Sequence, residues 1–418
     1  MSARAISDYV AAIDIGTTKI CVVIAQPQQD GNVHVIGVGQ YPSYGLKKGV
    51  VVNISSTVES IKRALKEAEA MAGVCVEQAV VGIAGGHIKS FNSTGVVGIK
   101  RKDVTQSDIN RVIEAAKAVP IPQDREILHV LPQYFRVDGQ ETVQDSLGMY
   151  GVRLEAQVHI VTGATSSAQN IVKACEMAGV RITDIALEQL ASAQAVLTPT
   201  ERELGVGILD IGGGTSDFAV YQNGRIRYSK VFPIAGNHFT NDIAIGLGIP
   251  IQYAENLKKK YGCVLEDLLL RSGVEKVTIP LDYEGGSKEI ETSSLLEILR
   301  PRAEEIFSFL KEEIVTNRLV PHMPSGLVIT GGGALLKGLS KLIQSSYEMP
   351  VRVGMPRYYF DEICSDRVPE ALRSPVYSTV YGLLAFALKQ DDYYLQRSAP
   401  PLVQRVFKRM KSWIYDFI

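Results

Sequence analysis

Two copies of one short pattern most constrain how this chain can fold. The apolar run Tyr9–Ile15 leads into Asp14-Ile15-Gly16-Thr17-Thr18-Lys19, and the residues from Ile20 to Gln26 are again apolar. In the second half, Gly205–Ile211 leads into Asp210-Ile211-Gly212-Gly213-Gly214-Thr215, and Phe218–Tyr221 follows. An apolar run, a glycine turn and a second apolar run predict a β-hairpin. Because the repeat is on the scale of a domain, it predicts two similar halves that face each other.

The two turns share the residue types that bind a chain of phosphates. Glycine lets backbone N–H groups approach phosphate oxygens closely, and threonine hydroxyls add donors. Asp14 and Asp210 each precede a glycine by two residues and can hold a hydrated Mg²⁺ ion. One glycine hairpin alone is common, but two that close from opposite sides would clamp a triphosphate. Neither turn matches GxxxxGK[ST], which excludes a P-loop NTPase.

Two further features can complete such a site. The strand-like Leu327–Thr330 runs into the glycine run Thr330–Gly333, and a helix is expected from about Leu335. The glycine backbone can pass close to an adenine or a ribose, or it can be an ordinary strand-to-helix turn. Glu255 and Lys258 lie three residues apart on one face of a predicted helix. They can hold ribose or base, or form a solvated ion pair.

The segments around these motifs differ in character. Strand-like pieces at 95–99, 130–137 and 155–161 surround one helix at about 107–118, which predicts an inserted α+β subdomain. A helix at 55–72 is expected to be capped by Ser55 or Ser56. Residues 389–401 are polar and end in Pro-Pro, which predicts a linker. Other helices are expected at 165–177, 187–197, 240–247, 250–261, 294–316 and 374–388.

The last segment, 402–418, is strongly amphipathic as a helix. Its apolar residues fall in one arc of roughly 160° at 100° per residue. Basic residues flank this arc, and the only Trp of the chain lies in it, a residue that favours membrane interfaces. The segment is too short to span a bilayer. It is predicted to lie in the membrane interface, with docking onto the protein's own body as the alternative. The expected membrane-facing residues are Val403, Val406, Phe407, Met410, Trp413, Ile414 and Phe417.

Composition excludes several classes of protein. Hydrophobic residues are 46% and charged residues 21% of the 418, which rules out global disorder. A net charge of -1 argues against a partner that is a nucleic acid. Five cysteines lie far apart with no CxxC pair, which disfavours a zinc site or a disulfide scaffold. Without a long apolar run or a signal peptide, the body is expected to be soluble and intracellular.

The motifs, in this order, resemble the actin-like ATPase superfamily. IDIGTTK and LDIGGGTSD look like its two phosphate motifs, VITGGGALLKGL like its adenosine motif, and ALEQLASAQAVL and SPVYSTVYGLLAFA like its two connecting helices. The stretch from VVGIAGGHIKSFNSTGVVGI to VRLEAQVHIVTG is similar to the subdomain inserted in the FtsA family of bacterial cell-division proteins. AGNHFTNDIAIGLGIP and the tethered tail are also similar to that family. The resemblance covers essentially the whole chain.

The resemblance implies an α/β fold of the actin-like ATPase type, with two lobes around a nucleotide cleft. The insert, 85–164, replaces the usual small subdomain of the first lobe, whose core is 1–84 and 165–205. The second lobe has its core at 206–245 and 323–388, and a small partner-binding subdomain at 246–322. A linker at 389–401 then leads to a membrane-targeting helix at 402–418.

The resemblance also implies the residues of an ATP and Mg²⁺ site. Asp14 and Asp210 carry over to its Mg²⁺ side. Glu188 matches the place where related ATPases position the attacking water, although FtsA-like proteins are poor ATPases and Gln189 stands where a proline often follows. The alternative for Glu188 is a carboxylate favoured by a helix N-terminus. The implied nucleotide contacts are Gly16, Thr17, Thr18, Lys19, Gly212, Gly213, Gly214, Thr215, Gly236, Glu255, Lys258, Gly331, Gly332 and Gly333.

The function implied is that of a structural adaptor and at most a weak ATPase. Such a protein binds ATP, polymerises into filaments, tethers the C-terminal tail of FtsZ to the cytoplasmic face of the membrane at the division site, and recruits later division proteins. Arg302 falls where the family keeps an arginine at the FtsZ groove; the alternative is a surface arginine paired with Glu305 or Glu297. Two other functions stay open. A sugar-kinase-like phosphotransferase lacks an evident base, and the tail argues against an actin-like adaptor of type IV pilus assembly.

Overall fold

The two halves of the chain are built on two five-stranded sheets of the same topology. The computed structural model describes residues 9–27, 33–280, 286–356 and 373–394. In each sheet the first three strands form an antiparallel meander, and two later strands are added in parallel to the first. The first sheet has the order β10 (Arg181–Leu187), β6 (Gln78–Ile83), β1 (Val10–Ile15), β2 (Lys19–Pro27) and β3 (Val33–Pro42).

The second sheet repeats this arrangement and confirms the predicted repeat. Its order is β13 (Arg225–Phe232), β12 (Ser216–Gln222), β11 (Val206–Ile211), β16 (Leu327–Thr330) and β17 (Val351–Val353). The two glycine turns join equivalent pairs of strands, because Asp14 lies opposite Cys21 in one hairpin and Asp210 opposite Asp217 in the other. Asp217 is therefore the structural counterpart of Cys21.

Two helices cross between the sheets. α4 (Glu188–Val196) follows β10 and contacts β11 and β12, while α12 (Ser378–Tyr394) packs on β1, β2 and β6. A Cβ atom at Gly382 of α12 would lie 1.8 Å from the carbonyl oxygen of Ala191 in α4, so only glycine permits this crossing. α12 also includes the first residues of the segment 389–401 that was expected to be a linker.

Two local predictions from the sequence are corrected. The cap of α1 (Ile54–Ala72) is Asn53, whose side-chain oxygen accepts the Ser56 N–H at 3.0 Å, and neither Ser55 nor Ser56. An asparagine outside the helix reaches its first free N–H groups, whereas both serines already lie within the first turn. After the third glycine run, Gly332–Leu335 is a 3₁₀ turn, and α10 (Leu339–Tyr347) begins only after Gly338.

The insert forms its own layer of sheet and helix. Its strands are β7 (Lys89–Gly98), β8 (Arg125–Val137) and β9 (Arg153–Ala164), in the order β7-β9-β8, and α2 (Gln106–Lys117) packs on β7 and β9. A separate apolar core lies between sheet and helix, with Ile109, Val112 and Phe135 among its buried residues. The expected α+β subdomain is thus a compact unit with a core of its own.

The insert is bonded to the edge strand of the second sheet. The Gln133 amide donates to the carbonyl oxygens of Ile226 and Arg227 at 3.0 and 2.9 Å. The Ser90 hydroxyl donates to the carbonyl of Ser229 at 2.7 Å, and the His159 ring lies 2.8 Å from the Ser229 hydroxyl. Although the insert belongs to the first half of the chain, these contacts fix it to β13 of the second half.

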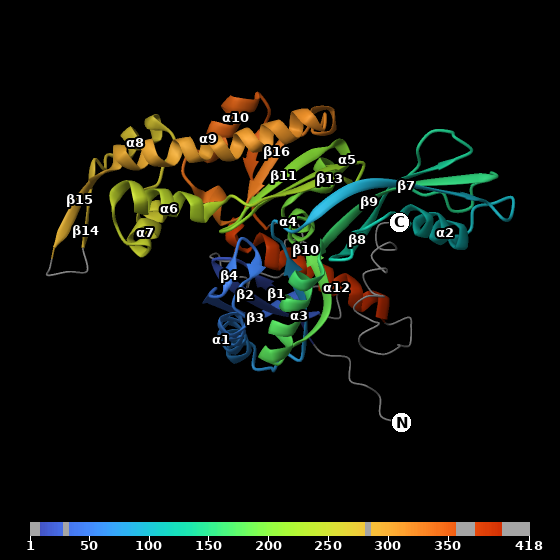
Figure 1. Ribbon diagram of the computed structural model, residues 1–418, viewed down its shortest axis with the longest axis horizontal. Helices are drawn as coiled ribbons and strands as arrows, with labels where there is room; N and C mark the ends of the chain where they lie inside the picture. The colour runs from blue at the N-terminus through green and yellow to red at the C-terminus, as the bar shows by residue number, and fades with distance from the viewer. Residues whose placement is uncertain (1–8, 28–32, 281–285, 357–372, 395–418) are drawn as a thin grey trace.

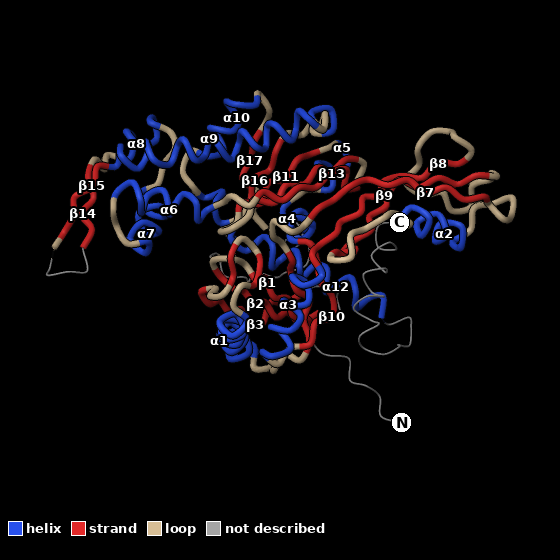
Figure 2. Tube along the Cα trace, in the orientation of Figure 1, coloured by secondary structure: helices blue, strands red, loops and turns tan. Residues whose placement is uncertain are grey.

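A helical subdomain lies at the opposite end of the molecule from the insert (Figure 1). Figure 2 shows this end as mainly helical and the insert end as mainly strands. No helix within the described residues has the length and apolar character needed to cross a bilayer. The elements of the helical end are α6 (Gly236–Leu247), α7 (Ile251–Tyr261), α8 (Glu266–Ser272), β14 (Lys276–Pro280), β15 (Ser287–Glu291) and α9 (Thr292–Thr316).

Smaller elements join these parts. They are β4 (Leu46–Lys47), β5 (Val50–Val51), α3 (Thr165–Ala178), α5 (Pro199–Leu204), and short 3₁₀ turns at Val320–His322 and Pro375–Tyr377. The predicted amphipathic tail, 402–418, lies outside the described residues.

Candidate functional site

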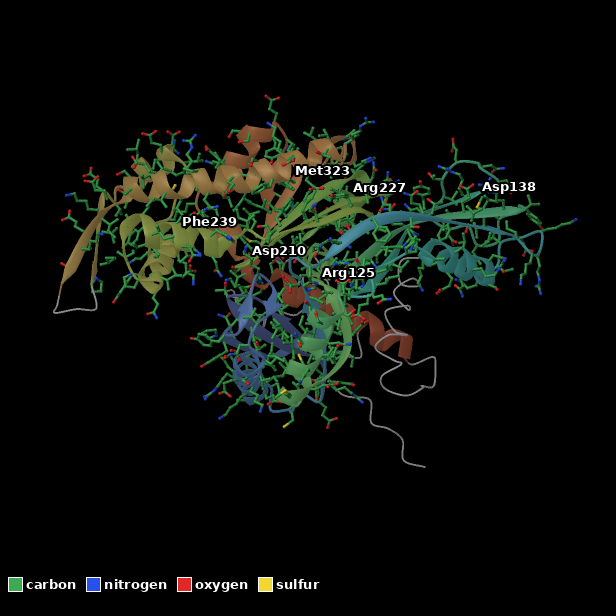
Figure 3. The ribbon with its side chains drawn as sticks, in the orientation of Figure 1. Arg125, Asp138, Asp210, Arg227, Phe239 and Met323 are labelled. Atoms are coloured by element: carbon green, nitrogen blue, oxygen red, sulfur yellow. The ribbon has the colours of Figure 1, made fainter. Side chains whose placement is uncertain are left out.

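The two glycine hairpins meet face to face between the sheets, as the sequence repeat predicted. A Cβ atom at Gly213 would lie 1.8 Å from Oγ1 of Thr18, and one at Gly214 would lie 2.5 Å from Oγ1 of Thr17. Figure 3 places Asp210, at the end of β11, in the middle of the molecule where the two halves adjoin. Because a side chain at either glycine would collide with the opposite hairpin, this close approach requires glycine.

The first residues of α6 are hydrogen-bonded to the second hairpin. The backbone N–H of Gly236 donates to the carbonyl of Gly212 at 3.0 Å, and that of Asn237 donates to Gly213 at 2.8 Å. The Thr18 hydroxyl reaches across from the first hairpin to the side-chain oxygen of Asn237 at 3.3 Å. Gly236 therefore lies beside the hairpin, as the resemblance implied.

Lys258 connects α7 to the same region. Its ammonium nitrogen lies 3.1 Å from the carbonyl oxygen of Gly236, 2.8 Å from the Thr240 hydroxyl and 2.7 Å from a carboxylate oxygen of Glu255. Glu255 and Lys258 thus form the ion pair that their spacing allows, but it is only partly exposed and adjoins the second hairpin. The pair is placed where it can also meet a ligand.

The third glycine run packs against the end of β11. Gly331 has φ 81°, and a Cβ atom there would lie 2.2 Å from Oδ1 of Asp210. A Cβ atom at Gly333 would lie 2.3 Å from Cγ2 of Ile211, while Gly332 has no such close neighbour. All three glycine motifs of the sequence therefore converge on the residues around Asp210.

Four carboxylates gather behind the hairpins: Asp14, Glu188, Asp210 and Asp217. Three are buried, and Glu188, the first residue of α4, is partly buried. Asp210 accepts hydrogen bonds from the hydroxyls of Ser192 in α4 and Thr379 in α12. The Thr215 hydroxyl donates to one oxygen of Asp217 at 2.9 Å, and the other oxygen of Asp217 has no hydrogen-bond partner in the part of the chain that the structure describes.

Burial disfavours ionisation throughout this cluster. The pKa of Asp14 is raised to about 6 and that of Asp217 to about 8, in each case by burial and, to a smaller extent, by the charge of Asp210. The pKa of Glu188 is raised well above its usual range by burial and then by the charges of Asp14, Asp217 and Asp210. A cation in this region would favour the ionised forms and relieve their repulsion.

One cation of the chain already faces the cluster. The ammonium of Lys19 lowers the pKa of Asp14 against the effect of burial. Its nitrogen is buried, has no hydrogen-bond partner among the described residues and lies 4.2 Å from the centre of the Tyr377 ring. A buried ammonium with unused donors can bind an anionic ligand.

The residues fit a magnesium–phosphate group bound between the hairpins. Among the described residues, no three His, Cys, Asp or Glu side chains lie close enough together to ligate a metal ion directly. This fits a Mg²⁺ ion that keeps several waters and is held by one or two carboxylates and substrate phosphates. The side-chain-free glycine turns and the unpaired Lys19 ammonium supply what the phosphates need.

Part of this site was not predicted from the sequence. Asp217 lies within the LDIGGGTSD motif. It pairs with Asp210 across the second hairpin as Cys21 pairs with Asp14 across the first, so the repeat itself was a signal for Asp217. Ser192 and Thr379 carried no signal, because their role depends on how α4 and α12 cross. Gln189 is fully buried, and its side-chain amide makes no hydrogen bond to any residue that the structure describes.

Arg302 lies on α9, away from the hairpins. Its guanidinium donates to Oδ1 of Asp242 in α6 at 2.9 Å and also pairs with Glu305 one turn further along α9. The pairing with Glu305 is one of the two alternatives that the sequence left open, whereas the pairing with Asp242 was not predicted.

Comparison with known proteins agrees with this architecture. The family model described as "SHS2 domain inserted in FTSA" matches residues 85–162, and the model "Cell division protein FtsA" matches residues 207–382. A solved PilM-PilN type IV pilus biogenesis complex is similar, with a TM-score of 0.64 at 15% identity, over 91% of this chain and 98% of that chain. MreB5 of Spiroplasma citri bound to ADP has a TM-score of 0.53 at 15% identity, over 94% of this chain and 99% of that chain. The fold is that of the actin-like ATPases.

Full-length relatives give the family within that class. The cell division protein FtsA of Pseudomonas aeruginosa is 43% identical over 416 residues, covering 97% of each chain. FtsA of Escherichia coli K12 is 35% identical over 97% of each chain, and FtsA of Bacillus subtilis is 36% identical over 92% of this chain and 84% of that one. The chain belongs to the FtsA family of cell-division proteins.

The raised pKa of Asp217 predicts how stability depends on pH. The unfolded chain releases this proton near pH 3.8, whereas the folded protein keeps it until about pH 8. The folded state thus binds more protons between these values, and its stability falls as pH rises through them. Asp217→Asn removes this loss, so the variant without nucleotide should melt above the parent, by a much larger margin at pH 8.5 than at pH 5, since each kcal/mol shifts Tm by about 2–4 °C.

The matched control is Asp103→Asn, which replaces an exposed aspartate of the insert. Differential scanning fluorimetry between pH 5 and 8.5 measures all three proteins. An equal shift for both variants, or no dependence of the Asp217→Asn shift on pH, would contradict the assignment.

Proposed function

We propose that the protein binds ATP with Mg²⁺ between the two hairpins. The observation that carries this proposal is the buried carboxylate cluster beside two facing, side-chain-free glycine turns and an unpaired buried ammonium. The backbone N–H groups of Gly16–Thr18 and Gly212–Thr215 would hold the phosphates together with Lys19. Asp14 and Asp210 would hold waters of the Mg²⁺ ion, which neutralises phosphate charge when bound.

The adenosine would lie beside the second hairpin. Gly331–Gly333 and the Glu255–Lys258 pair border that side, and Gly236 lies between them and the phosphate turn. The threonines of the first hairpin touch the glycines of the second, so a triphosphate can enter only if the hairpins move apart. ATP binding would thus change the angle between the two lobes.

Glu188 is the candidate for positioning an attacking water. It lies at the start of α4 among the other carboxylates, and its raised pKa keeps it protonated in the absence of a cation. A cation that arrives with ATP would favour the ionised form, which is the form that can accept a proton from water. We infer that ATP mainly sets the state of the protein and its ability to form filaments, and that turnover is incidental.

The wider function that we propose is that of an adaptor in cell division. Membership of the FtsA family supports a role at the division site on the cytoplasmic face of the membrane. There the protein would form filaments, bind the C-terminal tail of FtsZ through the subdomain 246–322, recruit later division proteins and attach to anionic lipids through 402–418. Family membership favours this function over a sugar kinase or a pilus adaptor.

Binding of ATP is tested at Asp210. Because Ser192 and Thr379 both donate to its carboxylate, Asp210→Ala would remove one acceptor from two buried hydroxyls. Asp210→Asn keeps an acceptor and removes the charge. Both variants should bind MgATP at least about tenfold more weakly in titration calorimetry, which corresponds to about 1.4 kcal/mol. Unchanged affinity in the folded Asp210→Asn variant would remove the second hairpin from the site.

Binding of FtsZ is tested at Arg302. An acidic tail peptide would take over the guanidinium from Asp242 and Glu305 through charge-assisted hydrogen bonds. Arg302→Glu should weaken binding of a labelled FtsZ tail peptide more than about tenfold in fluorescence anisotropy. Arg300→Glu is the matched control, because Arg300 lies on the same helix and, within the described residues, pairs only with Glu304. Equal losses in both variants would show that total charge decides, and intact binding in Arg302→Glu would place the site elsewhere.

Attachment to the membrane is tested in the tail. Trp413→Glu puts a charge on the predicted apolar arc and should lower binding to anionic vesicles more than tenfold, because burying one large apolar side chain contributes about 1.5–3 kcal/mol. Tyr415→Glu makes a similar change on the predicted polar arc and should have a small effect. Co-sedimentation with vesicles measures both. A deletion of 402–418 that still binds like the parent chain would exclude the tail as anchor.

A further inference from the structure

The far end of the insert exposes apolar side chains next to a run of basic ones. We call residues 98–104 and 147–152 the insert tip. The two segments lie side by side, because the N–H of Ile99 donates to the carbonyl of Val152 and the N–H of Gly151 donates to that of Lys102. Tyr150 is 79% exposed and Val152 is 76% exposed, and Leu147 is also exposed.

The basic side chains of the insert tip have no partner among the described residues. Lys100, Arg101 and Lys102 are exposed and form no ion pair or side-chain hydrogen bond with the described residues. Asp103 is the one acidic residue within the insert tip, so the tip has a formal charge of +2 from three basic residues and one acidic residue. Unpaired cations beside exposed aromatic and aliphatic side chains mark a surface that suits an anionic, partly apolar partner.

Hydrogen bonds connect the insert tip to the insert, and the insert to the second sheet. The carboxylate of Asp138, which Figure 3 places near the far end of the insert, accepts the N–H groups of Val152 and Arg153 at 3.0 and 2.8 Å. At its other end the insert is bonded to β13 through Gln133 and His159. A contact made by the tip would therefore orient the whole body, and not only a loose loop.

The direction of α12 favours a lipid bilayer as this partner. α12, the last described element before the predicted membrane-binding tail, runs from the centre of the molecule toward the side that carries the insert (Figure 1). If the tail reaches a bilayer from that side, the insert tip lies on the same side. Lysine and arginine attract anionic headgroups, and tyrosine and valine can enter the interface between headgroups and acyl chains.

We propose that the insert tip is a second contact with an anionic lipid bilayer, weaker than the tail. This inference rests on the proposed membrane attachment of the tail and extends it. The tail alone would leave the body free to rotate on its linker, whereas two separate contacts fix one face of the body toward the membrane. The tip would thereby set the orientation in which the cleft and the FtsZ-binding end face the cytoplasm.

Two tryptophan reporters test the tip and the tail separately in the full chain. The parent has Trp413 as its only tryptophan and reports on the tail. A chain with Tyr150→Trp and Trp413→Phe reports on the tip. With vesicles containing phosphatidylglycerol and brominated lipid, we expect quenching of both reporters, and with vesicles of phosphatidylcholine alone we expect much less.

The two reporters distinguish failure of the tip from failure of the tail. Quenching of Trp413 without quenching of the Tyr150→Trp reporter would overturn the proposal and leave the tail as anchor. If neither is quenched, membrane attachment as a whole is wrong. A Tyr150→Trp reporter that responds to poly-L-glutamate and not to vesicles would assign the tip to an acidic peptide, and would also overturn the proposal.

The contribution of charge is measured with a matched pair of variants. Lys100→Glu with Lys102→Glu should lower the affinity for anionic vesicles by roughly tenfold or more and weaken its dependence on salt. Lys62→Glu with Lys66→Glu makes the same change of net charge on exposed positions of α1, away from the insert. The affinity of this control should change less than twofold. Equal losses in the two variants would overturn the proposal, because total charge and not the tip would then decide.

Discussion

The close crossing of α4 and α12 is the contact on which the rest of the structure depends. These helices lie between the two sheets, and Gly382 lets their backbones approach more closely than any other residue would allow. Asp210 adds a polar link, since it accepts hydrogen bonds from Ser192 in α4 and Thr379 in α12. The end of the second hairpin is therefore bonded to both helices, and a change at the hairpin is transmitted directly to the region between the lobes.

The same arrangement also determines how the carboxylates of the cleft ionise. Packing two hairpins and two helices around one point buries carboxylates that would be ionised in water. Burial and mutual repulsion raise the pKa values of these groups, so their ionised forms are disfavoured until a cation binds. A nucleotide that arrives with Mg²⁺ would supply this charge and separate the hairpins. Nucleotide binding would then be coupled to a change in the angle between the two lobes.

The insert connects the surface at its tip to the second half of the chain. It leaves the first half of the chain after β6, yet its hydrogen bonds go to β13 in the second half. A movement of one lobe against the other must therefore either carry the insert with the second lobe or break these bonds. Through these bonds the second sheet connects the insert, at one end of the molecule, with the helical subdomain, at the other.

The sequence by itself determined the local parts of this protein. Both glycine hairpins and the strands of the insert follow from apolar runs and turn residues that are adjacent in the chain. The family resemblance supplied the two-lobed fold. Only the tertiary structure decided that Asp217 joins the carboxylate cluster, that His159 and Gln133 fix the insert to β13, and that Arg302 pairs with Asp242. These contacts join residues that are far apart in the chain, so their geometry depends on how whole elements cross and pack, which no local pattern of residues encodes.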